Sequence, residues 1–154
     1  MLGSEEVSRV VTRELLTLPE VTATIGEAAV AQIYFLPAVP LPPGGISPFP
    51  CCLNYPRATQ YDQPINGLGE ITTEVVQFEI RFIDNKASAN RIRAATVAQL
   101  RHFNGKRFDE VVHGRNWMFQ FEAVGETEMP HLMEGTDFYS QRGTIYDVMI
   151  TQGG

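Results

Sequence analysis

The chain has 154 residues, of which 44% are hydrophobic and 19% are charged, and its formal net charge is -6. A length near 150 residues fits one domain, and the acid excess argues against a protein that binds nucleic acid or a membrane surface through Lys and Arg. Charged residues fall below the roughly 25% of typical globular domains. We therefore expect part of the uncharged surface to be covered by other chains.

The first residues carry acidic side chains where a signal peptide needs a basic start and an apolar core. No apolar stretch approaches the roughly 20 residues of a membrane span, so no membrane partner is expected. Cys51 and Cys52 are adjacent, which disfavours a disulfide between them. We expect both to be reduced packing residues in a cytosolic compartment, with side chains on opposite faces of a strand.

The N-terminal part predicts two helices and a strand. Ser4 can cap a helix that runs to about Thr17, with Glu5 and Glu6 in its first turn, where the helix dipole favours anions. Pro19 suits the first position of a second, short helix that ends near Ile25. A strand is expected from about Ala31 to Leu36.

A proline-rich segment follows, because eight of the ten prolines lie between Pro37 and Pro64. Proline lacks a backbone donor and disfavours helix at the preceding residue. This composition predicts an extended arm, interrupted by a short strand at Cys51–Tyr55. The alternative is a flexible linker, although neither flanking part looks large enough to fold alone.

The remaining chain predicts a sheet and a second main helix. Ile71–Asp84 alternates between apolar and polar residues, which is typical of a strand with one solvated face. The other expected elements are a helix at Ala87–Asn104, strands at Asn116–Val124 and Gly143–Thr151, an edge strand at Phe108–His113, and a long loop at Gly125–Arg142. The expected fold is one α+β domain over residues 1–154, a mainly antiparallel or mixed β-sheet packed by two main helices on one face.

The sequence lacks the short signatures of common catalytic and nucleotide sites. Glu74, Glu79 and Glu122 are possible paired carboxylates on neighbouring strands, but strand glutamates more often form a solvated face. The three histidines, His102, His113 and His131, are scattered over different expected elements. Alternating Trp117, Phe119 and Phe121 resemble a base-stacking platform, yet the core side of a sheet explains them better. We expect no cofactor, no metal and no enzymatic activity.

The order of elements resembles the tail-terminator (tail completion) family of tailed bacteriophages. The resemblance rests on the helix VSRVVTRELLTLPEVTATIG, the strand AQIYFL, the arm PAVPLPPGGISPFP leading into CCLNY, the strand EVVQFEIRFID, the helix ANRIRAATVAQLRHF and the last strand TIYDVMIT. It covers nearly the whole chain and is an order of elements, not a catalytic signature.

The resemblance implies a virion protein of the tail or neck, assembled in the host cytoplasm. Such proteins form a homo-oligomer, a hexameric ring, that caps the tail tube protein, stops its polymerisation and offers a docking surface to the head–neck connector or stopper protein. Genomic DNA would pass through the lumen without specific binding, which suits an acidic chain. Alternatives are another head–tail neck or connector ring subunit, and a small α+β ligand-binding domain or enzyme.

The candidate contacts with a neighbouring subunit, the tube or the neck lie in the arm and in two expected inserts, Arg57–Gly69 and Gly125–Arg142. A preset extended segment loses little entropy when it binds along a neighbour. The candidate residues are Leu41, Pro42, Pro43, Ile46, Phe49, Tyr61, Asp62, Met129 and Leu132.

Overall fold

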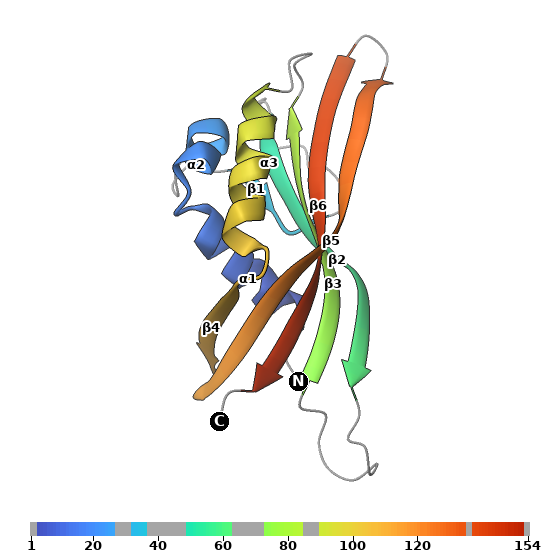
Figure 1. Ribbon diagram of the computed structural model, residues 1–154. Coiled ribbons are helices and arrows are strands. Elements are labelled where there is room, and N and C mark those ends of the chain that lie inside the picture. The colour runs from blue at the N-terminus through green and yellow to red at the C-terminus, as the bar shows by residue number, and fades with distance from the viewer. Residues whose placement is uncertain are drawn as a thin grey trace.

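The computed structural model describes residues 3–26, 32–36, 49–62, 73–84, 90–134 and 137–152, with side chains in these ranges except at 58–62, 73, 90–91, 127–134 and 137–139. Three helices in this part of the chain cover one face of a six-stranded sheet (Figure 1). The α+β fold expected from the sequence is confirmed. None of the described helices is long and apolar enough to cross a membrane.

The helices are α1 (Ser4–Leu15), α2 (Pro19–Ile25) and α3 (Asn90–Phe103). Ser4 was expected to be the cap of α1, but it is the first helical residue and Gly3 occupies the cap position. The Gly3 amide donates a hydrogen bond of 2.9 Å to Glu6 Oε2. The side chain of the third helical residue therefore satisfies the backbone amide of the cap residue, as in a capping box.

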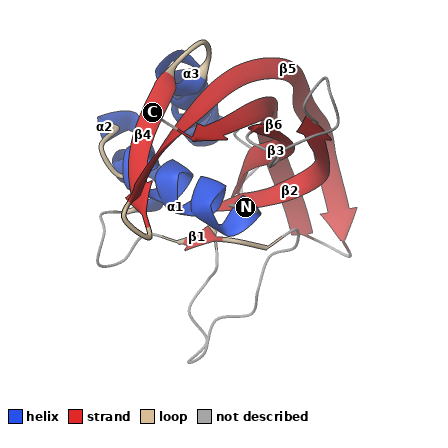
Figure 2. Cartoon of the chain, turned by 90° about the horizontal axis from the view of Figure 1, so that it is seen from below, coloured by secondary structure: helices blue, strands red, loops and turns tan. Residues whose placement is uncertain are grey.

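The sheet has the strand order β1-β2-β3-β6-β5-β4. Only the β1–β2 pair is parallel, and the other four pairs are antiparallel. The bounds are β1 (Ile33–Tyr34), β2 (Cys51–Asp62), β3 (Thr73–Asp84), β4 (Arg107–Val112), β5 (Arg115–Glu134) and β6 (Asp137–Gln152). In Figure 2 the sheet curls strongly and α1 crosses between its two edge strands.

Two segments that were expected to be loops are strands. The segment Gly125–Arg142 is the far part of the β5–β6 hairpin, whose pairing runs from Trp117↔Gln152 to Glu134↔Asp137 with two irregularities. Similarly, β2 continues through a bulge between Pro56 and Ala58 as far as Asp62. Their polar residues predict loop, but these segments pair with neighbouring strands through their backbones.

The core lies between the helices and one face of the sheet. Helix α1 contributes Val7, Val10, Val11 and Leu15, all 0% exposed. The sheet contributes apolar side chains that alternate along its central strands, and α3 closes the layer; the buried set includes Val76, Phe78, Ile80, Phe82, Ile92, Ala95, Phe103, Trp117, Phe119, Phe121, Tyr146, Val148 and Ile150. The aromatic residues of β5 are thus core residues, as expected, and form no stacking platform.

Buried polar groups join the layers. Gln99 of α3 donates to Thr144 Oγ1 at 2.5 Å and accepts from the Tyr146 hydroxyl at 2.7 Å. In helix α1, buried Ser8 donates to Asn54 of β2, and the more exposed Arg13 of the last turn pairs with Glu110 of β4. The buried contacts of Gln99 and Ser8 hold α3 and α1 on the sheet, since buried polar groups that lose their partners carry a large penalty.

The second face of the sheet is less solvated than the alternation in β3 predicted. Cys51, Leu53 and Ile83 form a small buried cluster there, and Phe49, Tyr34 and Tyr55 pack against it. Cys52 belongs to the main core instead. The expectation that the two cysteines point to opposite faces and act as packing residues is therefore confirmed.

Candidate assembly interface

The predicted arm residues lie mostly outside the described structure. Leu41, Pro42, Pro43 and Ile46 are not among the described residues. Phe49 is described, and it packs against the Cys51, Leu53 and Ile83 cluster. Its ring is half-buried within the same chain, so only part of it remains for a neighbour.

The other predicted contacts lie on strands at opposite ends of the sheet. Tyr61 and Asp62 end β2 and pair with Glu74 and Thr73 of β3. Met129 and Leu132 lie in the far part of β5 and pair with Gln141 and Tyr139 of β6. Figure 1 shows the end of β2 at the bottom and the β5–β6 hairpin at the top. The fold therefore separates these candidates into two regions.

A charged cluster that the sequence did not reveal lies on the sheet face away from the helices. Glu79 of β3 is 1% exposed. It accepts hydrogen bonds from the Tyr55 hydroxyl and from Arg81, whose Nη2 lies 3.1 Å from Glu79 Oε2. Arg81 also donates to Gln141 of β6 at 3.2 Å. The cluster connects three strands, and the strict alternation of β3 had wrongly predicted a solvated Glu79.

Burial keeps the acidic protons of this face in place. Burial and the hydrogen bond to Glu79 raise the pKa of Tyr55 to about 12, so the phenol stays a donor at neutral pH. Burial, with the nearby Asp84 charge, raises the pKa of the Cys51 thiol to about 12. On the opposite, helix-covered face, burial also raises the pKa of Cys52 well above its usual value. Neither thiol has the exposed, thiolate-favouring setting of a reactive cysteine.

The candidate carboxylates do not come together. Glu74 shares the helix-covered face of β3 with Val76 and Phe78, whereas Glu79 lies on the opposite face. Glu122 of β5 is exposed and lies beside Asp147 of β6 in the sheet register. A pair of carboxylates for acid–base work must face one site, and Glu74 and Glu79 do not.

The histidines are separate as expected. The His102 ring lies 3.0 Å from Glu14 Oε1 between α3 and α1. His113 has a positive φ of 51° in the turn before β5, and His131 lies on the distal part of β5. In the described part of the chain, no three His, Cys, Asp or Glu residues group in a way that would hold a metal ion.

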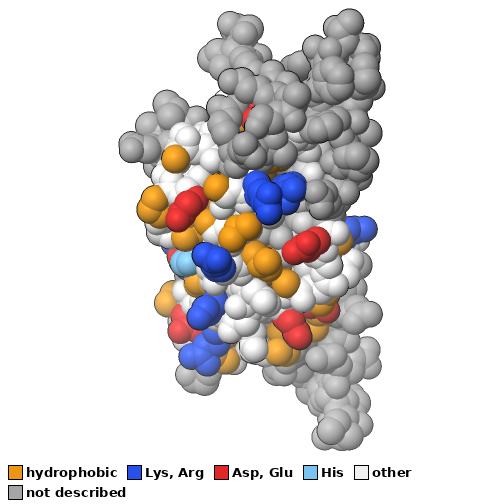
Figure 3. All heavy atoms as spheres, turned by 45° about the horizontal axis from the view of Figure 1, so that its top comes forward, with side chains coloured by type: hydrophobic (Ala, Val, Ile, Leu, Met, Phe, Trp, Pro, Cys, Tyr) orange, Lys and Arg blue, Asp and Glu red, His pale blue; other side chains and the backbone are white. Residues whose placement is uncertain are grey.

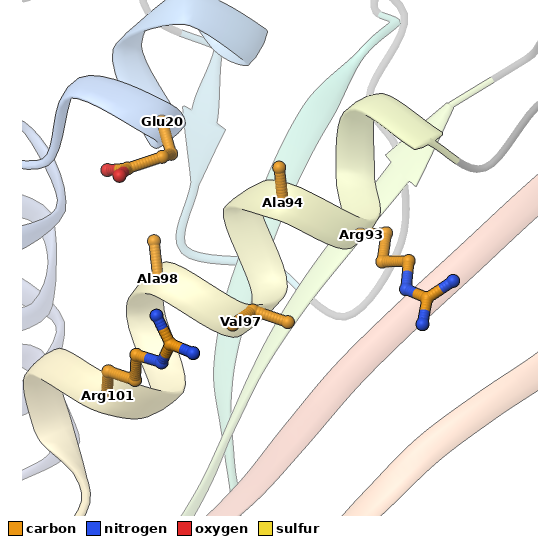
Figure 4. A pocket seen from close by; sticks show the side chains of 6 residues that line it. All are labelled: Glu20, Arg93, Ala94, Val97, Ala98 and Arg101. Carbon is orange, nitrogen blue, oxygen red and sulfur yellow. The ribbon is translucent and has the colours of Figure 1, made fainter.

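An open groove of about 370 Å³ lies on the outer surface of α2 and α3. Figure 4 shows Glu20 of α2 across from Ala98 of α3, and Arg93 directed away from Glu20. The remaining lining residues are Ala94, Val97 and Arg101. Figure 3 shows basic, acidic and hydrophobic side chains interspersed over one face of the molecule. The charged groups that line the groove are one carboxylate and two guanidinium groups, which is a poor set for catalysis.

Both edges of the sheet are only partly covered by its short edge strands. Strand β1 pairs with Cys52 and Leu53 of β2 and no further. Strand β4 pairs with β5 from Arg115 to Gln120. In the described residues, no strand pairs with the outer edge of β2 from Ala58 or with that of β5 from Gly125. The sequence of the β5 edge is polar and turn-rich, which predicts a loop and not a strand.

The described architecture defines a class of fold: an α+β domain whose curled mixed sheet carries its helices on one face and extends into a long terminal hairpin. No protein-family model and no curated protein matches the chain. Among solved structures, the chain is similar to a chain of the virion of a native gene transfer agent particle, with a TM-score of 0.50 and 18% identity over 94% of this chain and 92% of that chain. At this identity the similarity shows a shared fold.

Proposed function

We propose that the protein is a structural virion protein of a phage-like particle, and specifically a ring-forming tail terminator. In this role it caps the tail tube, stops polymerisation of the tube protein and provides the docking surface for the head–neck connector. The observation that carries the proposal is the fold shared with a virion chain over 94% of this chain. The order of helices and strands that resembles tail terminators supports the same role.

The chemistry of the described residues is compatible with assembly rather than catalysis. Glu74 and Glu79 lie on opposite faces of β3, Glu122 lies two strands away on β5, and both cysteines are buried. We therefore propose no enzymatic activity and no cofactor. Six copies with a formal charge of -6 each would give a lumen through which DNA passes without the counterion release that Lys-rich walls would cause.

Deleting the gene from the genome that encodes it tests this function. A missing terminator should give overlong tails or tails without heads, visible by negative-stain electron microscopy, and the gene supplied in trans should restore their length. The purified protein added to tail tubes should bind at one end of each tube. Particles of normal tail length and infectivity would overturn the proposal.

The same fold evidence favours a second candidate, a head–tail neck or connector ring subunit. Loss of such a subunit should leave tails of normal length beside heads that have lost their DNA. The third candidate, a small ligand-binding domain or enzyme, has only the groove over α2 and α3 in its favour. For that class, the purified protein should be monomeric and deletion should leave particle structure unchanged.

A further inference from the structure

We propose that neighbouring copies of this chain join edge to edge, with the outer edge of β2 at Ala58–Asp62 pairing with the outer edge of β5 at Gly125–Met129 of the next copy. This inference rests on the proposed ring function. Each run has five consecutive residues that pair without a break with the neighbouring strand of the same chain, β3 in the case of β2 and β6 in the case of β5. A free strand edge presents unpaired N–H and C=O groups that another strand can bind.

The register shows which groups of β2 point outward. The Cys52 amide donates outward to Gln32 O at 2.9 Å, so residues opposite Ile83, Arg81 and Glu79 face β3. The same alternation along β3, continued past the bulge, directs the backbone groups of Ala58 and Gln60 to β3. It leaves those of Thr59 and Tyr61 outward.

The same reasoning applies to β5. The Phe121 amide donates to Lys106 O at 2.9 Å on the β4 side, and Phe121 is opposite Val148 of β6. Residues opposite the even-numbered positions of β6 therefore face outward. Past the bulge near Val124 these are Glu126 and Glu128, which pair in register with Thr144 and Arg142. Each edge thus has two residues whose outward backbone groups pair with no other strand among the described residues.

The direction of the strands fits a contact between copies. Strands β2 and β5 are separated by three antiparallel pairings, so they run in opposite directions. When a second copy continues the sheet in the same orientation, its β5 is antiparallel to β2 of the first. The two edges are different surfaces of one chain, as a closing ring requires. In full register Thr59 opposes Glu128 and Tyr61 opposes Glu126, so no like charges meet.

We call the proposed contact between the β2 and β5 edges of two copies the seam. Two features limit it to these runs. Pro56 lies at an outward position of β2 and Pro130 lies within the second irregularity of β5, and proline has no N–H to offer a neighbour. The two runs also lie at different levels: they align with residues 147–151 and 141–145 of β6. Copies joined through them must therefore be staggered along the strands, which inclines the strands to the ring axis, as in closed sheets.

A disulfide between copies tests the seam. The double variant Gln60→Cys with Thr127→Cys places thiols on a non-hydrogen-bonded antiparallel pair, whose Cα atoms lie about 4.5 Å apart, within disulfide range. The two positions lie on opposite sides of β3 and β6, so no bond forms within one chain. Cys51 and Cys52 are buried and do not compete. Mild oxidation at about 1 mM chain should give a ladder of covalent oligomers on a denaturing gel.

The control pair is Gln60→Cys with Asp109→Cys, because Asp109 is an exposed residue of β4 outside the seam. It should give dimers at most. In a second arm, Thr59→Pro and Glu128→Pro remove one outward N–H each and should weaken association about tenfold or more, whereas Thr59→Val and Glu128→Gln retain the N–H and should not. Circular dichroism checks that the proline variants remain folded.

Absence of the ladder overturns the seam. Native mass measurement on the same sample separates this failure from that of the proposed function. Rings of fixed size without a ladder would mean that copies join elsewhere, and the terminator role would stand. Monomers at every concentration, together with normal tails after gene deletion, would reject both the seam and the terminator role.

Discussion

At the residue scale, burial decides which polar side chains have unusual chemistry. Glu74 is 2% exposed although it is a carboxylate, and its Oε2 has no hydrogen-bond partner among the described residues. Burial is the main cause that raises the pKa of this carboxyl above its usual value, with Glu6 adding to the effect and the chain's amino terminus opposing it. The expectation that strand glutamates form a solvated face is therefore wrong for Glu74, which shares the buried face of β3 with Val76 and Phe78.

This burial predicts a pH-dependent stability. A raised pKa in the folded state favours the protonated form, so the contribution of Glu74 to stability is present below its unfolded pKa and is lost as the pH rises through the folded one. Glu74→Gln cannot ionise and should be more stable than the parent at pH 7, with the gap shrinking toward pH 4. Urea unfolding at a series of pH values measures this gap.

Glu122→Gln is the matched control, because Glu122 is an exposed carboxylate on a neighbouring part of the sheet. Its difference from the parent should stay small across the same pH range. A Glu74→Gln variant that is less stable at pH 7, or equally shifted at all pH values, would contradict the burial argument.

At the element scale, apolar periodicity predicted most helices and central strands. The heptad-like spacing of Val7, Val10, Val11 and Leu15 places α1 correctly, and the two-residue period places β3. The far halves of β2 and β5 were missed because their residues are polar and include Pro56 and Pro130. These segments become strands because they pair with a neighbouring strand. The local residue preferences do not predict this pairing.

The proline-rich segment between β1 and β2 has its own prediction. Tyr34 is in register with Leu53, so the end of β1 lies only about 8 Å from Cys51, given strand spacings of about 4.8 Å and a rise of about 3.3 Å per residue. Deleting Leu41–Ser47 leaves residues 35–40 and 48–50 to connect them, which is ample length. The deletion should leave the monomer folded and abolish ring closure or docking on the tube.

Thermal unfolding by circular dichroism checks the fold of this deletion variant, and electron microscopy with tail tubes checks its assembly. A scrambled segment of the same length and composition is the control for chain length alone. Unchanged ring closure and tube binding after the deletion would reject the role of the arm in assembly.

At the scale of the whole molecule, α1 connects β2 near one sheet edge with β4 at the other through Asn54 and Glu110. Helices and sheet also share one continuous core. We therefore expect residues 1–154 to unfold as one cooperative unit. Far-ultraviolet circular dichroism and the fluorescence of Trp117, which is 7% exposed in that core, should report coincident transitions in urea.

Two separate transitions would show that the N-terminal helices or the distal hairpin form an independent unit. The variant Ser8→Ala, which removes the α1 contact to Asn54, provides a comparison. It should shift both signals together and by the same amount, since a cooperative unit loses stability as a whole.

The sequence by itself determined the α+β class, the helix positions, the core faces of β3 and β5 and the packing role of the cysteines, because each depends on local periodicity and side-chain size. Only the tertiary structure decided that the expected loop at Gly125–Arg142 is a hairpin, that Glu74 and Glu79 are buried on opposite faces, and that the described edge strands cover only part of each sheet edge. These features depend on which strands meet. That choice comes from backbone pairing and layer packing between distant segments, which no local pattern encodes.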